Sequence, residues 1–204
     1  SVYISDAGNH CIYSIAPNGI VTVLSGGTPG CQDGSKEQAA FKRPGGLCLV
    51  AQRQLILAET GHGRILVVKP DGSVANFAGR SRSGTVDGTV AKSTFFKPQA
   101  LFSASSNDLL VADSMSNKIR RIRNGLVTTF AGSPERGSGN GRKDLANFDS
   151  PTGICISSSN TVYIADTNNH VIRHITDGTV FNFAGSGVPG FQDGPGDVAK
   201  FNSP

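Results

Sequence analysis

Residues 161–185 read TVYIADTNNHVIRHITDGTVFNFAG and carry the pattern that decides the fold. Three runs of mostly β-branched and aromatic residues, at 161–166, 171–175 and 180–184, are separated by a short polar loop and by the dipeptide Asp177-Gly178. Residues of this kind favour strands, and Asp-Gly accepts the positive φ that a two-residue hairpin turn requires. A further apolar run, 153–157, precedes them across a polar turn. We therefore expect four short antiparallel strands here.

The same pattern recurs along the chain with a period of 53 or 54 residues. The turn glycines are Gly19, Gly72, Gly125 and Gly178, and a second glycine set is Gly26, Gly79, Gly132 and Gly185. The prolines are Pro44, Pro98, Pro151 and Pro204, and the acids are Asp6, Glu59, Asp113 and Asp166. Because four independent markers keep one interval, the chain consists of four copies of one structural repeat.

Four short strands per repeat, without helical periodicity, predict an all-β propeller in which each repeat forms one blade with its first strand innermost. The approximate repeats are 1–44, 45–98, 99–151 and 152–204, within one propeller domain of 204 residues. The chain begins at a second strand, so we expect 15 strands, with three first strands and four of each other kind. Long segments connect the blades, at 26–44, 79–98, 132–151 and 185–204, and each contains a Phe three residues before its Pro.

The repeats resemble the NHL repeat. The resemblance lies in the stretches beginning at Asp6 and Asp166, which contain the pairs Asn9-His10 and Asn169-His170, and in Phe-Ala-Gly at 183–185. It covers nearly the whole chain, although the repeats that contain Glu59 and Asp113 lack the Asn-His pair. The resemblance implies a six-bladed ring. We therefore expect these four blades to be an excerpt of a longer chain, able to associate with the missing blades or with another chain.

The composition excludes several classes of protein. No apolar run approaches the roughly 18 residues of a membrane span, so we expect no role in a membrane. The net charge of +4 permits an acidic partner without demanding one. The four cysteines form no Cys-x-x-Cys pair, and no Asn-x-Ser/Thr acceptor occurs. These two absences favour an intracellular location.

The recurring acids and histidines have two interpretations. The acids Asp6, Glu59, Asp113 and Asp166 could form a ring of metal ligands, but a short acid after a strand also accepts N–H groups of the following tight loop. We favour the structural role, and we predict no metal and no cofactor. Lyases built on NHL-like six-bladed rings use metal-binding His residues with a catalytic Tyr or Arg. The tyrosines here are strand residues without such a constellation, so we predict that the protein is not an enzyme.

The long segments between blades are the part of the sequence most suited to binding, because long loops without regular structure are often functional. Their basic residues outnumber their acids, mostly in the second and third segments. The predicted binding residues are Arg80, Arg82, Lys92, Arg136, Arg142, Lys143 and, as an exposed aromatic at a loop tip, Phe191. Arg is favoured both at protein interfaces and at phosphates.

Two partner classes fit these loops. The first is a protein or peptide bound to the propeller as a scaffold. The alternative is RNA, as in some NHL proteins of the tripartite-motif class, which would need a concentrated basic face with exposed stacking groups. We favour protein binding, because acids dilute the basic residues and the Phe before each Pro is expected in the core.

Overall fold

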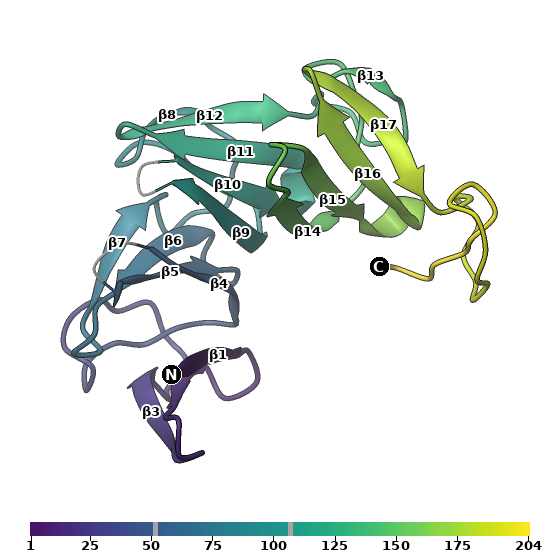
Figure 1. Cartoon of the computed structure of the whole chain (residues 1–204). Helices are drawn as coiled ribbons and strands as arrows, with labels where there is room; N and C mark the ends of the chain where they lie inside the picture. Colours follow the sequence, from purple (N-terminus) through teal and green to yellow (C-terminus); the bar gives the residue numbers. More distant parts are fainter. Residues whose placement is uncertain (51–52, 106–107) are drawn as a thin grey trace.

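Four antiparallel sheets follow one another along the chain as propeller blades, which confirms the predicted all-β fold. They are seen in a computed structural model that describes residues 1–50, 53–105 and 108–204 (Figure 1). Blade one consists of β1 (Val2–Asp6), β2 (Cys11–Ile15) and β3 (Val21–Gly26). Blade two consists of β4 (Pro44–Leu49), β5 (Leu55–Glu59), β6 (Arg64–Val68) and β7 (Val74–Ala78).

Blades three and four each have the four expected strands and one further short strand at the outer edge. Blade three consists of β9 (Pro98–Ser105), β10 (Asp108–Asp113), β11 (Lys118–Arg123) and β12 (Leu126–Ala131), with β8 (Gly88–Thr89) outside. Blade four consists of β14 (Pro151–Ile156), β15 (Val162–Asp166), β16 (Val171–Thr176) and β17 (Thr179–Ala184), with β13 (Gly141–Arg142) outside. The 15 expected strands are thus present, and the sequence pattern missed β8 and β13.

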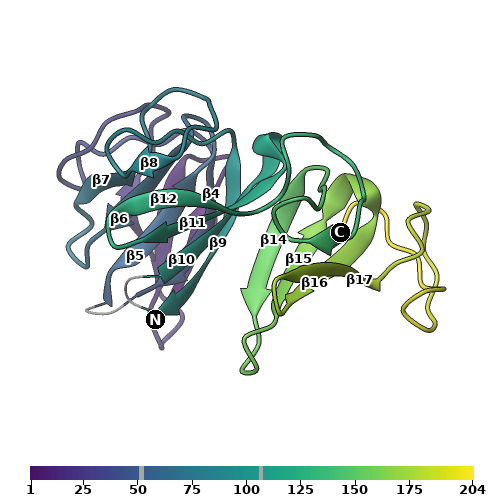
Figure 2. The same cartoon turned by 90° about the horizontal axis from the view of Figure 1, so that it is seen from above.

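The blades form an open arc with their first strands on its inner side, as expected (Figures 1 and 2). β4 packs against β9, and β9 packs against β14. Two 3₁₀ turns, η2 (Ser114–Ser116) and η3 (Thr167–Asn169), lie between the second and third strands of blades three and four. Within the described residues, no helix is long and apolar enough to cross a membrane.

The hydrophobic core lies between neighbouring blades. Leu57 of blade two packs in the cluster shared with blade one, whereas the preceding residue, Ile56, points to the opposite face of the sheet and packs in the cluster shared with blade three. Both faces of a blade are therefore covered, which explains why its strands read as continuous apolar runs. The Phe before each of the first three segment prolines is fully buried in one of these clusters: Phe41, Phe95 and Phe148.

The second glycine set of the repeat has a steric cause. Gly26 has φ of +84°, and a Cβ atom there would lie 2.6 Å from the carbonyl oxygen of His10 and equally close to the Phe41 ring. Gly185 has φ of +104°, and its Cβ would lie 2.6 Å from the carbonyl oxygen of His170. Only glycine fits where the fourth strand ends under the preceding loop.

Candidate functional site

The segments between blades pack onto the blade that follows them. β8 pairs with the outer strand β12 of blade three, and β13 pairs with β17 of blade four. In the first segment, Gly34 forms the corresponding bridge to Val74 of blade two. These segments and the loops between second and third strands share one face, which we call the loop face.

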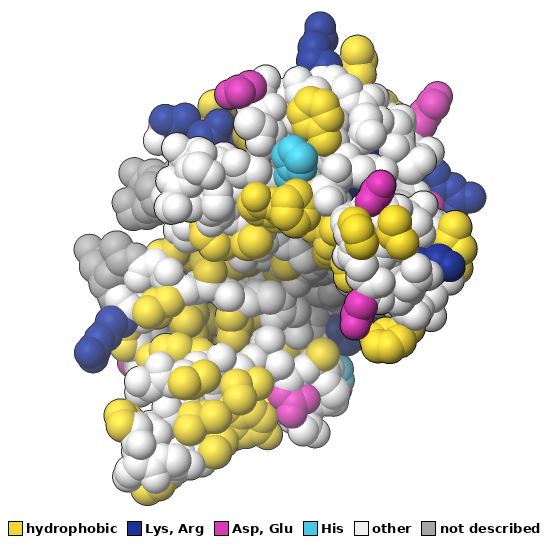
Figure 3. Space-filling view, turned by 45° about the vertical axis from the view of Figure 1, so that its right-hand side comes forward, with side chains coloured by type: hydrophobic (Ala, Val, Ile, Leu, Met, Phe, Trp, Pro, Cys, Tyr) yellow, Lys and Arg dark blue, Asp and Glu magenta, His cyan; other side chains and the backbone are white. Residues whose placement is uncertain are grey.

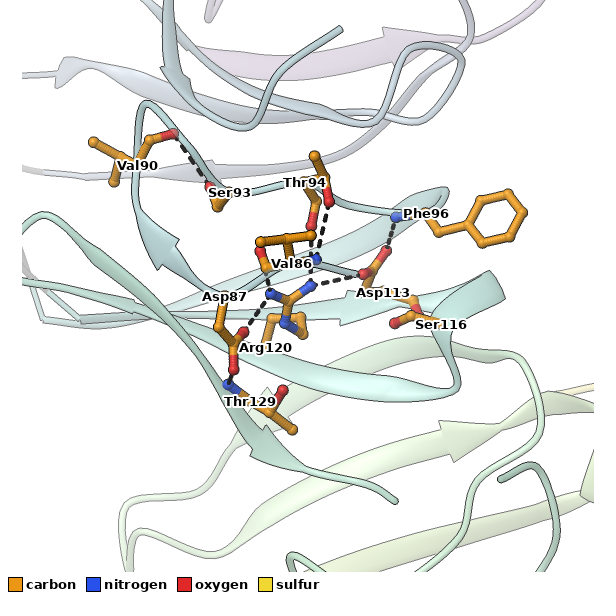
Figure 4. Close-up of polar contacts among 10 residues, drawn as sticks. All are labelled: Val86, Asp87, Val90, Ser93, Thr94, Phe96, Asp113, Ser116, Arg120 and Thr129. Atoms are coloured by element: carbon orange, nitrogen blue, oxygen red, sulfur yellow. Dashed lines mark hydrogen bonds and ion pairs between the residues drawn. The ribbon is translucent and has the colours of Figure 1, made fainter. Parts of the chain in front are cut away.

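A buried ion pair holds each of the first three segments, and blade three shows it most completely (Figure 4). Asp113 ends β10 and accepts the backbone N–H of Phe96 at 2.7 Å and Nη1 of Arg120 at 3.2 Å. The Arg120 side chain is fully buried and also donates to Asp87 in the segment. The second oxygen of Asp87 accepts the N–H of Thr129 at 2.9 Å. The acid, the arginine and the Asp of the Asp-Gly pattern therefore tie segment and blade together.

The same arrangement recurs in the two neighbouring blades with different residues. In blade four, Asp166 accepts the N–H of Asp149 and Nη1 of Arg173, each at 2.8 Å, and Arg173 donates to Asn140. In blade two, the corresponding contacts join Glu59, Lys42, Arg64, Asp33 and Asn76. Arg120 and Arg173 further stack over Phe95 and Phe148, each at 5.3 Å from the ring centroid. These contacts explain why the Asp-Gly and Phe positions recur.

The recurring acids thus have structural partners in every blade. Asp6 accepts the N–H groups of Gly8 and Asn9, as the loop-capping interpretation predicted. The other three acids reach the preceding segment and a buried arginine, which the sequence interpretation did not include. Burial raises the pKa of the Asp166 carboxyl, and it raises the pKa of Asp113 to about 6 against the opposing effect of Arg120.

The Asn-His pairs also support the loops. His10 Nδ1 accepts the N–H of Arg43 at 3.1 Å, and His170 Nδ1 accepts the N–H of Ser203 at 3.0 Å. Asn9 and Asn169 donate through Nδ2 to Asp6 and Asp166. The pairs therefore connect the acid of one blade to the end of the next segment.

The predicted binding residues lie on the loop-face segments, but in different environments. Arg80, Arg82, Lys92 and Arg136 are exposed. Arg142 is engaged by Asp144, and its hydrogen bonds hold the pKa of the Asp144 carboxyl down at about 2. Lys143 lies over the Phe130 ring, with Nζ 4.2 Å from the centroid. Arg142 and Lys143 are therefore less free to meet a partner.

Phe191 is the most exposed of the large apolar residues described, at 96%. It lies in the last segment, which extends away from blade four (Figure 2), whereas Arg80 and Arg82 lie in the second segment. The structure does not bring the basic residues and this aromatic together. In the face shown in Figure 3, hydrophobic side chains gather in the hollow of the arc, and most Lys and Arg side chains lie toward its margin.

A polar cleft opens between blades two and three, and we call it the interblade cleft. Its volume is about 280 Å³. The residues that line it are Lys42, Arg43, Thr60, Gly61, Ser83, Lys97 and Gln99. Thr60 Oγ1 donates to the carbonyl oxygen of Pro98 at 2.7 Å and so joins the two blades beneath it. The cleft carries three cationic side chains at one place on the loop face.

The three cations of the interblade cleft are exposed, and none of them forms an ion pair with a carboxylate in the described part of the chain. Arg43 and Lys97 each precede a segment proline and have φ of +54° and +62°. This left-handed conformation is uncommon for a residue with a side chain. The backbone conformation at these repeat positions therefore sets the direction in which the Arg43 and Lys97 side chains project.

Sequence reasoning missed two features of this face. The first is the set of buried arginines, although Arg120 and Arg173 are 53 residues apart and so share the repeat interval. The second is the interblade cleft, because only the folded arc brings Lys42 and Arg43 beside Lys97. Basic residues immediately before Pro44 and Pro98 were the available signal.

Comparisons with known proteins agree with this architecture. Residues 148–175 match the model of the NHL repeat. The chain is 30% identical over 190 residues, 85% of its length, to Protein SUPPRESSOR OF QUENCHING 1, chloroplastic, of Arabidopsis thaliana. It is 30% identical over 159 residues, 66% of its length, to human NHL repeat-containing protein 2. These matches cover 18% and 22% of the two relatives, so the chain spans about a fifth of their length.

Solved structures show the same fold. An auxiliary nutrient binding protein from Bacteroides thetaiotaomicron matches 88% of this chain and 44% of its own, with a TM-score of 0.68 and 17% identity. Virginiamycin B lyase from Staphylococcus aureus matches 89% of this chain and 50% of its own, with a TM-score of 0.58 and 16% identity. With the four repeats, their sheets and these relatives in view, the chain belongs to the NHL-repeat family of β-propellers.

Proposed function

We propose that this protein is a non-catalytic binding module that holds an acidic peptide segment of a partner protein in the interblade cleft. The observation that carries the proposal is a set of three cations, Lys42, Arg43 and Lys97, around one cleft of about 280 Å³, none of which forms an ion pair within the described residues. Unpaired cations in a concave site attract an anionic group, and low-dielectric walls strengthen the attraction. Arg43 adds a planar guanidinium that can bind a carboxylate through two hydrogen bonds.

The walls of the cleft favour a peptide over a free anion. Ser83 and Gln99 offer side-chain donors and acceptors for a peptide backbone. Gly61 lets the chain pack closely against Lys42, because a Cβ atom there would lie 2.3 Å from the Lys42 carbonyl oxygen. Arg82, exposed and adjacent to Ser83, extends the positive surface along the second segment. The cleft is also pre-organised, because the Thr60 to Pro98 bond joins its two blades. A rigid site loses less entropy on binding.

RNA is the less favoured partner. Single-stranded RNA is recognised by stacking its bases on exposed aromatic rings. Phe41 and Phe95, each three residues before a segment proline, are fully buried, and Phe96, next to Lys97, is half-buried. The most exposed aromatic, Phe191, lies on another segment. The aromatic ring that adjoins these cations in the sequence, Phe96, is therefore half-buried, and the fully exposed ring lies on a different segment.

The lining residues also favour binding over catalysis. Within the described part of the chain, the cleft is lined by Lys, Arg, Thr, Gly, Ser and Gln side chains. A nucleophile or general base is usually activated by an adjacent His or carboxylate, and the cleft lining contains neither of these groups. This composition supports a recognition site.

The test is a fluorescence anisotropy titration with a labelled peptide of ten residues rich in Asp and Glu, a neutral Gly-Ser peptide and a labelled single-stranded RNA. The cleft variant is Lys42→Ser/Arg43→Asn/Lys97→Asn, in which Asn suits the positive φ. The matched control removes three exposed cations near the opposite face, as Arg53→Asn/Lys69→Ser/Arg123→Ser. Both variants lower the net charge from +4 to +1, since each loses three positive charges.

We expect the acidic peptide to bind the parent protein, and the cleft variant to bind it about tenfold or more weakly, because each exposed pair contributes up to about 1 kcal/mol. The control should lose much less affinity. Equal losses in the two variants would mean that net charge alone attracts the peptide. Tighter binding of RNA than of the peptide, lost in the cleft variant, would reassign the cleft to RNA.

A further inference from the structure

Three metal-binding types of side chain meet at the edge of blade two. A carboxylate oxygen of Glu59, the sulfur of Cys31 and a ring nitrogen of His62 all lie within 4.8 Å of one another. Cys31 comes from the first segment, while Glu59 ends β5 and His62 lies in the loop to β6. Residues far apart in the sequence thus converge because the segment packs onto the following blade.

The repeat shows that the fold does not require these residue types. The position of Cys31 is occupied in the other copies by Thr85, Ser138 and Phe191. The position of His62 is occupied by Asn9, Ser116 and Asn169. A thiol and an imidazole therefore replace ordinary repeat residues in the same copy, and at positions that lie side by side.

The three side chains differ in burial in a way that suits a site open to solvent. Glu59 is fully buried and is held by the N–H of Lys42 at 2.9 Å and by Nε of Arg64 at 2.8 Å. His62 is partly exposed, and its Nδ1 donates to Glu59 at 2.7 Å. Cys31 is exposed and donates to Ser81 Oγ at 3.2 Å. A cation arriving from solvent would meet the thiol and imidazole first and the fixed carboxylate beneath them.

The charges around the cluster favour a divalent cation. Arg64 pairs with both Glu59 and Asp33, so two carboxylates and one guanidinium leave one negative charge. A Cys31 thiolate would make this two. Nη2 of Arg64 is buried without a hydrogen bond in the described part of the chain, and Cys31 lies within electrostatic reach of this guanidinium. A bound divalent cation would balance the negative charge, and a metal-bound Cys31 thiolate could accept a hydrogen bond from the free Nη2 of Arg64.

Blade three shows that the charge count alone is insufficient. Asp113, Asp87 and Arg120 form the same set of charges there. The matching positions carry Thr85 and Ser116, neither of which is a usual ligand for a transition metal. What blade two adds is the pair of Cys31 and His62.

We propose that Cys31, Glu59 and His62 bind a thiophilic divalent cation, with Zn²⁺ as the first choice. Sulfur, imidazole nitrogen and carboxylate oxygen are the usual zinc ligands. Zinc bonds of about 2.0–2.3 Å place ligand atoms roughly 3.3–3.7 Å apart. The three ligand atoms here lie within 4.8 Å of one another, so small side-chain movements would bring them to these separations. Three protein ligands leave a fourth position for water or a partner's donor. This inference does not depend on the proposed peptide site.

The test is isothermal titration of the protein with Zn²⁺ under thiol-free reducing conditions, followed by Co²⁺ absorption spectroscopy. The site variants are Cys31→Ser and His62→Asn, and Asn is the residue that two other copies carry at this position. The matched controls are Cys155→Ser, at another exposed cysteine, and His170→Asn. Thermal melting without metal checks that every variant is folded.

We expect one equivalent of Zn²⁺ to bind the parent protein and both controls. Affinity should fall at least about 100-fold in each site variant, and the thiolate-to-cobalt charge-transfer band should disappear in Cys31→Ser. Zinc should raise the melting temperature of the parent and not of Cys31→Ser, because a ligand that binds only the folded state stabilises it. Unchanged binding in folded Cys31→Ser, or equal loss in the controls, would overturn the proposal.

Discussion

Arg120 illustrates how a charged side chain serves as an internal part of this repeat. Its side chain is fully buried, and its two terminal nitrogens reach Asp113, Asp87 and the carbonyl oxygens of Thr94 and Val86. Removing one partner of a buried ion pair costs about 3–5 kcal/mol, because the other charge remains buried. The repeat therefore depends on residues that an apolar pattern would not place in the core.

The raised pKa of Asp113 leads to a prediction with a definite sign. An acid whose pKa rises from 3.8 to about 6 on folding contributes stability that is present below pH 4 and is lost as the pH rises through about 6. Asp113→Asn cannot titrate. We expect the free energy of unfolding of the parent protein, minus that of Asp113→Asn, to increase as the pH is lowered from 7 to 4.5.

Urea denaturation of both proteins across this pH range is the measurement. The difference between the two proteins isolates Asp113, because the other acids titrate in both. Asp108 is one such acid, and hydrogen bonds from Arg121 lower its pKa. A difference that shrinks on acidification would mean that Arg120, rather than burial, controls the protonation of Asp113.

At the scale of elements, the long segments are part of the blades rather than free loops. Asp87 bonds both to Arg120 and to the N–H of Thr129, and β8 pairs with β12 directly beside it. Asp193 holds the same place in the last segment, is exposed, and makes no hydrogen bond or ion pair within the described residues. The two acids therefore form a natural comparison.

We expect Asp87→Ala to lower the free energy of unfolding by about 1–3 kcal/mol, because Arg120 and an outer-strand N–H each lose an acceptor. Asp193→Ala should change it by less than about 0.5 kcal/mol. Thermal melting measures both, and hydrogen exchange at Thr129 should accelerate in Asp87→Ala alone. Equal destabilisation by the two variants would count against the role of Asp87.

Much of the fold could be predicted at this scale because its causes are local. The Asp177-Gly178 turn requires positive φ at both residues, which the structure shows at +50° and +74°. The paired arginines and the interblade cleft could not be predicted in this way, since they depend on which segment packs against which blade. The position of the arginine also differs in blade two. Arg64 lies directly opposite Glu59 in the strand pairing, whereas Arg120 lies two residues beyond Lys118, the residue opposite Asp113.

At the scale of the whole molecule, the face of blade four that is turned away from blade three exposes an aromatic surface. Phe181 and Phe183 lie on the same face of the sheet, because both rings contact His174, at centroid distances of 5.4 and 5.7 Å. Phe183 also packs edge-on against Tyr163 at 5.0 Å. Both phenylalanines are exposed. Contiguous exposed apolar surface favours association.

We expect the protein to associate in a concentration-dependent manner, and Phe181→Ser/Phe183→Ser to shift it toward the monomer. Sedimentation velocity at several concentrations is the measurement. The control variant, Leu126→Ser/Leu145→Ser, removes two exposed leucines elsewhere and should leave association unchanged. A parent protein that is monomeric at every concentration would contradict this expectation.

The central functional claim is that the interblade cleft, rather than the basic surface as a whole, receives an acidic partner. The most direct measurement is an ¹⁵N chemical-shift titration with the acidic peptide, which reports on every assigned backbone amide at once. We expect the largest shifts at the amides of the residues that line the cleft: Lys42, Arg43, Thr60, Gly61, Ser83, Lys97 and Gln99. Shifts concentrated at the hairpin turns of the opposite face, or spread evenly over all exposed Lys and Arg residues, would contradict it.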